Sequence, residues 1–186
     1  VEIETNIKAM NTWTFVGAPF ANGYTLGAVK PVSEDVAMVK YDYEQGKWSD
    51  SWARIGTTMK AGEGIFAWPF YGGAITFSTY NFGASTSSTY PEDATATYAL
   101  NNGNFTVTET ITTSSNGKWM ALANPYPAKL SITKFLDANT FANSSVSSPS
   151  IQGEGVYIFN GTSFDYKKTG DILMTEGFFV NFVDAG

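Results

Sequence analysis

The sequence predicts an all-β domain: a β-sandwich, of which a jelly roll is one arrangement, with one short helix. Aromatic residues reach 16%, with 14 Phe, 10 Tyr and 5 Trp, and such side chains favour strands. The chain also has 18 Gly and 7 Pro, which punctuate it with turns. Its short apolar segments alternate with these turns. At 186 residues the chain is long enough to bury one substantial core, so we expect a single domain over residues 1–186.

The first half contains five segments with strand character. Residues 1–8 alternate apolar and polar side chains with period two, as a half-buried strand does. Gly46 lies between an aromatic, β-branched segment and Trp48, which indicates a hairpin. The predicted strands are residues 1–8, 13–16, 36–43, 64–68 and 74–80. A Gly-, Ser- and Thr-rich loop follows over residues 81–91.

The second half is expected to hold two hairpins and the helix. The Asn102-Gly103 step predicts a hairpin between strands at 95–100 and 105–112. Ser131 is suited to cap a helix over residues 131–139, with Phe135 and Leu136 on its apolar side. The last strands are predicted at residues 155–159, 164–166 and 177–182, with Asn160-Gly161 as a turn.

Missing residue types exclude several kinds of chemistry. The chain has no His and no Cys, which excludes nucleophilic triads, the usual zinc and copper sites and thiol chemistry, so no cofactor is expected. A net charge of -6 with a single arginine, Arg54, argues against nucleic acid as a partner. No apolar run approaches the roughly 20 residues of a membrane helix. The acidic residues Asp42, Glu44 and Asp50 could bind calcium, but a solvated hairpin face explains them better, so no metal site is predicted.

An internal repeat is the main organisational signal. Three blocks of the first part recur in the same order in the last part: residues 13–20 with 119–126, 46–48 with 160–164, and 59–66 with 172–179. We therefore expect two degenerate repeats, about 13–80 and 119–182, that share one core. The matching structural positions include Trp13 and Trp119, Pro19 and Pro125, and Gly64 and Gly177. Trp13 and Trp119 are both expected to be well buried.

The second repeat resembles a module of secreted and surface proteins of Bacteroidetes-type bacteria. That module runs from a Trp strand into Gly-Asn-Pro-Tyr-Pro, then a short helix, an Ile-Tyr-x-Trp-x-Gly hairpin and a Gln-Gly-Phe-Phe-Val strand. The matching segments here are Trp119, residues 123–127, the helix, residues 156–161 and residues 176–180. Ala123, Phe159 and Glu176 depart from the pattern. The resemblance implies a β-rich module in a secreted or cell-surface setting, and it brings no catalytic residues with it.

Turn aromatics are the candidate ligand-binding residues. Flat rings can stack on sugars, and Trp48, Trp52, Trp68 and Tyr71 lie in or beside predicted turns, as does Tyr80. The alternative is that these rings only fill the core. The Asn124-Pro125-Tyr126 segment could hold a sugar or peptide, but a strand-ending turn accounts for it better.

The expected role is that of a non-catalytic interaction module, structural or adhesive, whose partner is a protein or a glycan at the cell surface. A carbohydrate-binding module is the alternative. A glycoside-active enzyme domain is a second alternative, but it requires two carboxylates across a cleft, and no such pair can be chosen among 17 acidic residues.

Overall fold

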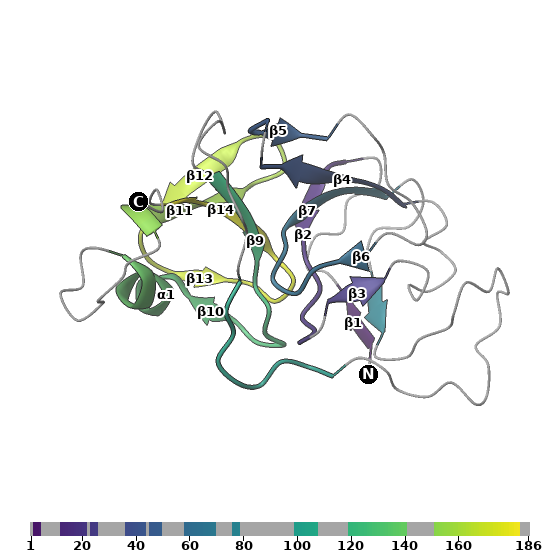
Figure 1. The fold of residues 1–186 in the computed structure, drawn as a ribbon, viewed down its shortest axis with the longest axis horizontal. Helices are drawn as coiled ribbons and strands as arrows, with labels where there is room; N and C mark the ends of the chain where they lie inside the picture. Colours follow the sequence, from purple (N-terminus) through teal and green to yellow (C-terminus); the bar gives the residue numbers. More distant parts are fainter. Residues whose placement is uncertain are drawn as a thin grey trace, which may run out of the picture.

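The computed structural model describes residues 2–4, 12–21, 23–25, 36–43, 45–49, 58–69, 76–78, 99–107, 119–140 and 151–182. These residues form antiparallel β-sheets and one short helix (Figure 1). The all-β prediction is therefore confirmed. Of the candidate ligand-binding residues, Trp48 and Trp68 are described, whereas Trp52, Tyr71 and Tyr80 lie outside the described residues.

The first half is built around a four-stranded antiparallel sheet. Its order is β2 (Thr14–Val16), β7 (Ile65–Pro69), β4 (Val36–Asp42) and β5 (Lys47–Trp48). The predicted hairpin joins the last two strands, and Gly46 adopts the positive φ of 64° that its turn requires. Two smaller pairs accompany this sheet: β3 (Tyr24–Thr25) with β6 (Thr58–Met59), and β1 (Glu2–Glu4) with β8 (Thr76–Ser78).

The second half has a four-stranded sheet with the same order. It runs from β9 (Trp119–Ala123) through β14 (Gly177–Phe182) and β11 (Ile151–Phe159) to β12 (Phe164–Lys167). A two-stranded pair, β10 (Leu130–Ser131) with β13 (Asp171–Ile172), takes the place that β3 and β6 have in the first half. Along the chain, β9 to β14 thus repeat the pairing scheme of β2 to β7. That the halves are two copies of one repeat stays a prediction.

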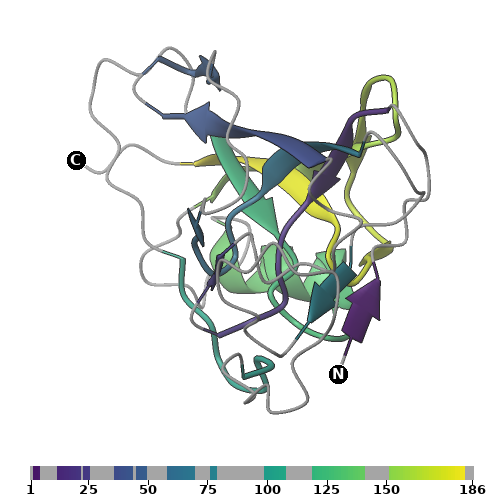
Figure 2. The same ribbon diagram turned by 90° about the vertical axis from the view of Figure 1, so that its right-hand side faces the viewer.

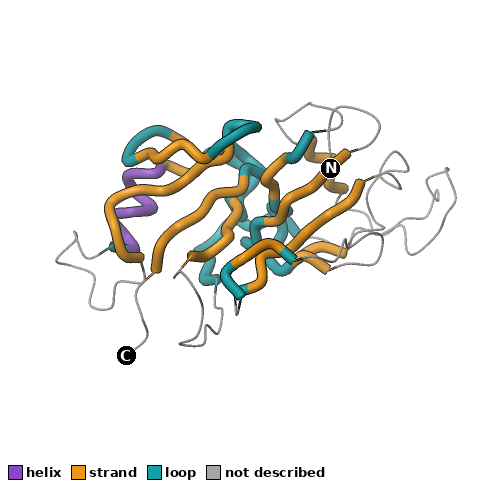
Figure 3. Tube along the Cα trace, turned by 90° about the horizontal axis from the view of Figure 1, so that it is seen from above, coloured by secondary structure: helices purple, strands orange, loops and turns teal. Residues whose placement is uncertain are grey.

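The single helix begins where Ser131 predicted it. In α1 (Ile132–Asn139), the Ser131 hydroxyl accepts a hydrogen bond from the Lys134 backbone N–H (3.4 Å). Ile132 and Leu136 are buried on the inner side of the helix. Helix α1 lies at the end of the molecule away from the strands of the first half (Figures 1 and 3).

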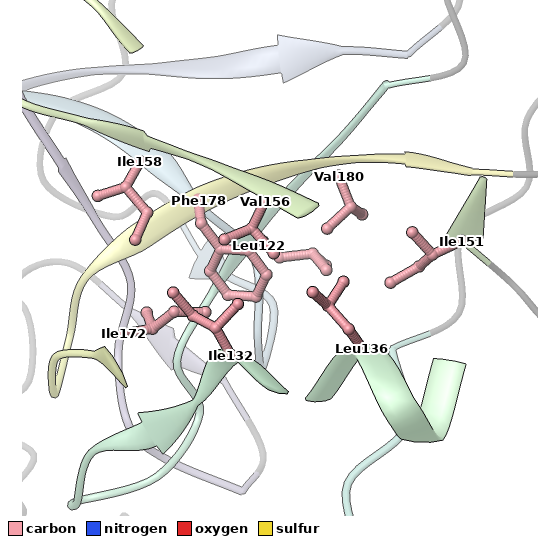
Figure 4. Close-up of a cluster of buried hydrophobic side chains, with 9 residues drawn as sticks. All are labelled: Leu122, Ile132, Leu136, Ile151, Val156, Ile158, Ile172, Phe178 and Val180. Carbon is pink, nitrogen blue, oxygen red and sulfur yellow. The ribbon is translucent and has the colours of Figure 1, made fainter. Parts of the chain in front are cut away.

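Three clusters of buried side chains make up the core. One lies between the first sheet and β6, and includes Phe20, Met38 and Met59. The second lies between the second sheet and α1 (Figure 4), with Leu122, Ile132, Leu136, Ile151, Val156, Ile158, Ile172, Phe178 and Val180. The third takes its buried side chains from β2, β4 and β7 of the first sheet and from β9 and β14 of the second. Figure 2 views the strands of both sheets from the side on which β1, β3 and β6 lie in Figure 1. One face of each four-stranded sheet therefore packs on the cluster within its own half, and the other face is directed at the other four-stranded sheet.

One predicted hairpin is wrong in its described part. Residues 99–107 form no strand, and Leu100 makes only an isolated bridge to Phe20. Asn101 is buried, and its side-chain oxygen accepts a hydrogen bond from the Gly103 N–H (3.4 Å). The local bond of Asn101 competes with strand pairing, so the Asn-Gly signal produced a turn without a hairpin.

Candidate functional site

The third cluster is an aromatic layer to which both sheets contribute. Its buried members are Phe15, Val39, Phe66, Ala121 and Phe179, and its half-buried members are Trp13, Tyr41, Trp48, Trp119, Tyr157 and Phe159. These side chains share the layer because side chains alternate between the faces of a strand, so Phe15, Phe66 and Val39 point away from the first half's own cluster.

Trp48, a candidate ligand-binding residue, belongs to this layer. Its ring packs edge-to-face on Phe66 (4.4 Å between ring centroids), on Tyr41 (5.4 Å) and on Phe179 of the other sheet (5.5 Å). Trp68 packs edge-to-face on Trp13 (5.2 Å). Both Trp48 and Trp68 are half-buried, so much of the surface of each side chain is covered by the residues packed against it.

The layer has matching contacts on its two sides. Tyr41 of β4 and Phe159 of β11 hold equivalent places, and so do Trp48 and Phe164. The ring centroid distances form pairs: Tyr41–Phe179 (5.2 Å) with Phe159–Phe66 (4.8 Å), and Trp48–Phe66 (4.4 Å) with Phe164–Phe179 (5.3 Å). Trp13 and Trp119 also correspond, but the prediction that both are well buried is wrong, because both lie half-buried at the margin of the layer.

Two crossing bridges join the halves through their backbones. Val16 bridges Glu176, and Leu122 bridges Glu63, each in antiparallel sense. In the sequence repeat, Val16 corresponds to Leu122 and Glu63 to Glu176, so the two bridges exchange equivalent residues. Such an exchange is the pattern of an isologous, two-fold interface.

Hydrogen bonds next to the crossing bridges match as well. The Gly17 N–H donates to the Thr175 carbonyl (3.0 Å), and the Ala123 N–H donates to the Gly62 carbonyl (2.8 Å). Thr175 and Gly62 also share a left-handed backbone, with φ of 65° and 71°. A left-handed threonine is uncommon, so the position is held by its surroundings.

The two bridge glutamates close turns in the same way. Glu63 Oε2 accepts from the Lys60 N–H (2.7 Å), and Glu176 Oε2 accepts from the Leu173 N–H (2.7 Å). They differ in charge compensation, because Lys40 also donates to Glu63 Oε2 (3.0 Å). Burial raises the pKa of the Glu176 carboxyl above its ordinary 4.5, against smaller opposing effects of the Leu173 N–H and Lys167. No sequence pattern predicts this difference between the halves.

Asn124 ties the Asn-Pro-Tyr-Pro segment to β13. The residue is fully buried, and its amide nitrogen donates to the carbonyls of Ala128 (2.7 Å), Leu173 (3.0 Å) and Ile172 (3.2 Å). Its amide oxygen accepts from the Tyr126 N–H (3.0 Å). These bonds engage both ends of the amide and hold the segment against β13. That the segment is structural and not a binding motif stays a prediction.

Among the described residues, the exposed aromatic side chains lie on β12. Phe164 is 38% exposed and Tyr166 is 48% exposed. Tyr166 lies 4.9 Å from Tyr157 between ring centroids, and Tyr157 lies 5.0 Å from Trp119. We call Trp119, Tyr157 and Tyr166 the aromatic row. Gly155 leaves room for its outer ring, because a Cβ there would lie 2.6 Å from Tyr166 Cζ.

Sequence reasoning did not single out the aromatic row as a site. The alternation Phe164-Asp165-Tyr166-Lys167 is a strand signal, but it does not tell that the strand lies at the edge of its sheet. The edge position of β12 comes from the strand order in the structure, where β5, with Trp48, is likewise the outermost strand of the first sheet.

Acidic groups offer no metal centre within the described residues, where no group of three or more carboxylates is placed to hold an ion. The Asp42 carboxylate accepts a hydrogen bond from the Gln45 N–H (3.0 Å), which closes the β4–β5 turn. Glu44 and Asp50 lie outside the described residues. Also within the described part of the chain, no helix combines the length and apolar character needed to cross a membrane.

The fold and these contacts define a mostly β domain whose two sheets share an aromatic layer. Residues 2–184 match the family model of a domain of unknown function, DUF8693, and the chain belongs to that family. Neither the curated proteins nor the solved structures contain a match to the chain.

Proposed function

We propose that this domain is a non-catalytic interaction module of a secreted or cell-surface bacterial protein, with a structural or adhesive role. The observation that carries the proposal is the aromatic row, in which the exposed ring of Tyr166 continues into the half-buried rings of Tyr157 and Trp119 across one sheet. Partly exposed Tyr and Trp combine an apolar ring with a polar tip, and such residues are enriched where proteins bind partners. The resemblance of residues 119–182 to a Bacteroidetes-type surface module supports the setting.

The matching halves support a scaffold built from two copies of one module. The two sheets share one strand order, and equivalent residues exchange bridges between them. In this reading the crossing bridges and the aromatic layer hold the halves together, and the edges of the sheets remain for partners. The carboxylates of Glu63 and Glu176 each close a turn by accepting a backbone hydrogen bond, which is a structural role.

Carbohydrate binding is the second candidate, and the aromatic row also favours it. Pyranose rings stack on aromatic faces through their C–H groups, while hydroxyls and charged side chains beside the rings bind sugar hydroxyls. Lys168 follows Tyr166 by two residues, next to β12, and is exposed. The site predicted at Trp48, Trp52, Trp68 and Tyr71 stays a prediction, and the aromatic row is a second candidate surface for a sugar.

Binding to polysaccharides separates the two candidates. The protein is run through native gels that contain one soluble polysaccharide each, alongside a glycan array. Retardation that Tyr166→Ala weakens about tenfold, while Tyr126→Ala in the Asn-Pro-Tyr-Pro turn leaves it unchanged, establishes a sugar site at the row. Gly155→Ala should weaken retardation too, because it displaces the Tyr166 ring without removing it.

The absence of sugar binding leaves the structural or adhesive role, which is then tested by pull-down of surface proteins with the same variants. Turnover tests the non-catalytic claim. Incubation with the polysaccharide panel should release no reducing ends. Reproducible release that a single Asp or Glu substitution abolishes would show an enzyme instead.

A further inference from the structure

Among the described residues, no strand pairs with the outer edge of β12, whose backbone groups follow a defined order. In the described sheet β12 is the outermost strand, paired with β11 only. The Asn160 N–H donates to the Ser163 carbonyl (2.9 Å), which makes those residues a hydrogen-bonded pair at the turn. Hydrogen-bonded and non-hydrogen-bonded pairs alternate along antiparallel strands. Phe164 and Tyr166 therefore direct their N–H and C=O groups away from β11, toward the open edge.

The side chains of β12 are self-complementary in one register. If two β12 strands pair antiparallel about a two-fold axis at Tyr166, the two Tyr166 residues exchange both backbone hydrogen bonds. Asp165 of each copy then lies opposite Lys167 of the other, on the same face of the joined sheet. This register forms two opposite-charge pairs, whereas an axis at Asp165 would place two carboxylates face to face.

Exposure agrees with an edge that is open for pairing. Residues 164–167 are all exposed, although Phe164 and Tyr166 carry large apolar surfaces. Charged side chains ordinarily discourage edge pairing. On β12 the negative Asp165 and the positive Lys167 lie two residues apart. They disfavour pairing with most other strands, but they complement the same two residues of a second, antiparallel β12.

We propose that the β12 edge binds the β12 edge of a second copy of this chain, which joins two four-stranded sheets into one of eight strands. This inference rests on the proposed interaction role and names one partner for it. Tyr166 of each copy meets at the axis, so the two aromatic rows become one continuous row. A long polymeric ligand would then contact both copies, and its apparent affinity would rise by avidity.

Charge-swap variants test the pairing. Sedimentation velocity of the full chain at low salt should show a monomer–dimer equilibrium that shifts toward monomer as salt increases. Asp165→Lys places lysine opposite Lys167, and Lys167→Asp places aspartate opposite Asp165, so each variant alone should dimerise about tenfold more weakly. A mixture of the two variants restores both opposite-charge pairs, and so does the double variant D165K/K167D. Both should dimerise like the original protein.

Tyr166→Pro is a second variant with a different mechanism. It removes an N–H that β11 does not use, so the hairpin should persist while dimerisation is lost. A monomer at all concentrations, or a dimer that neither the charge swaps nor Tyr166→Pro weakens, would overturn the inference. Polysaccharide or protein binding by a purely monomeric protein would still support the interaction role, so the two proposals can fail separately.

Discussion

At the scale of single residues, buried polar groups set the geometry of this domain. Asn124 satisfies three carbonyls and one N–H at once, and two of those carbonyls lie almost fifty residues further along the chain. Its role as a turn residue was predicted from the Asn-Pro-Tyr-Pro pattern. Its hydrogen-bond partners at β13 could not be predicted, because nothing in residues 123–127 indicates which distant strand approaches them.

Asn124→Ala should destabilise the fold by about 2–4 kcal/mol, because it leaves buried carbonyls without donors. Asn160→Ala is the matched control: Asn160 also makes several side-chain bonds, but it is exposed, so water replaces them. Urea unfolding followed by tryptophan fluorescence measures both free energies of unfolding. Equal losses for the two variants would contradict the structural role given to Asn124.

Replacing each bridge glutamate by the neutral glutamine should change the free energy of unfolding in opposite ways. Because the pKa of Glu176 is raised in the folded state, its ionisation opposes folding. The free energy of unfolding should therefore fall as the pH rises from 4.5 through the raised pKa, and Glu176→Gln should remove this decrease. Glu63→Gln should instead cost about 1 kcal/mol at neutral pH, since it weakens the bond to Lys40. Unfolding curves across pH 4 to 8 would contradict this if the two variants behaved alike.

At the scale of elements, local signals located most strands and the helix. Gly46 marked the β4–β5 hairpin, Asn160-Gly161 marked the β11–β12 hairpin, and Ser131 marked the start of α1. The Asn102-Gly103 hairpin was wrong in its described part because a buried Asn101 bonds locally. What local signals cannot give is strand order, which places β5 and β12 at the edges of their two sheets.

Close packing of strands at the crossing makes a second prediction at this scale. A Cβ on Gly177 would lie 2.6 Å from Phe15 Cγ and 2.9 Å from the Phe15 backbone carbon. Gly177→Ala should therefore cost about 2–3 kcal/mol by forcing β14 and β2 apart. Gly103→Ala is the control, because no atom lies within 4 Å of its added Cβ. A neutral Gly177→Ala in thermal unfolding would show that the strands are not this close.

At the scale of the whole molecule, the repeat blocks predict two related halves, and the two four-stranded sheets do have corresponding strand orders. That the halves are two copies of one repeat stays a prediction. The match of residues 13–20 with 119–126 located the strands β2 and β9, which carry one side of each crossing bridge. The sequence could not show that these strands reach across to the opposite glutamate. That arrangement depends on both halves being folded, so no local pattern encodes it.

Disulfide formation at the crossing bridges tests the reciprocal packing of the halves most directly, because the chain has no native Cys. The bridged residues sit in non-hydrogen-bonded pairs, whose Cα separation of about 4.5 Å suits a disulfide. The variants Val16→Cys/Glu176→Cys and Glu63→Cys/Leu122→Cys are air-oxidised and their free thiols counted by mass spectrometry, with single-Cys variants as controls. Reciprocal packing predicts a nearly complete intramolecular disulfide in both double variants of the folded protein. If either pair stays reduced while the protein is folded, the halves do not pack reciprocally.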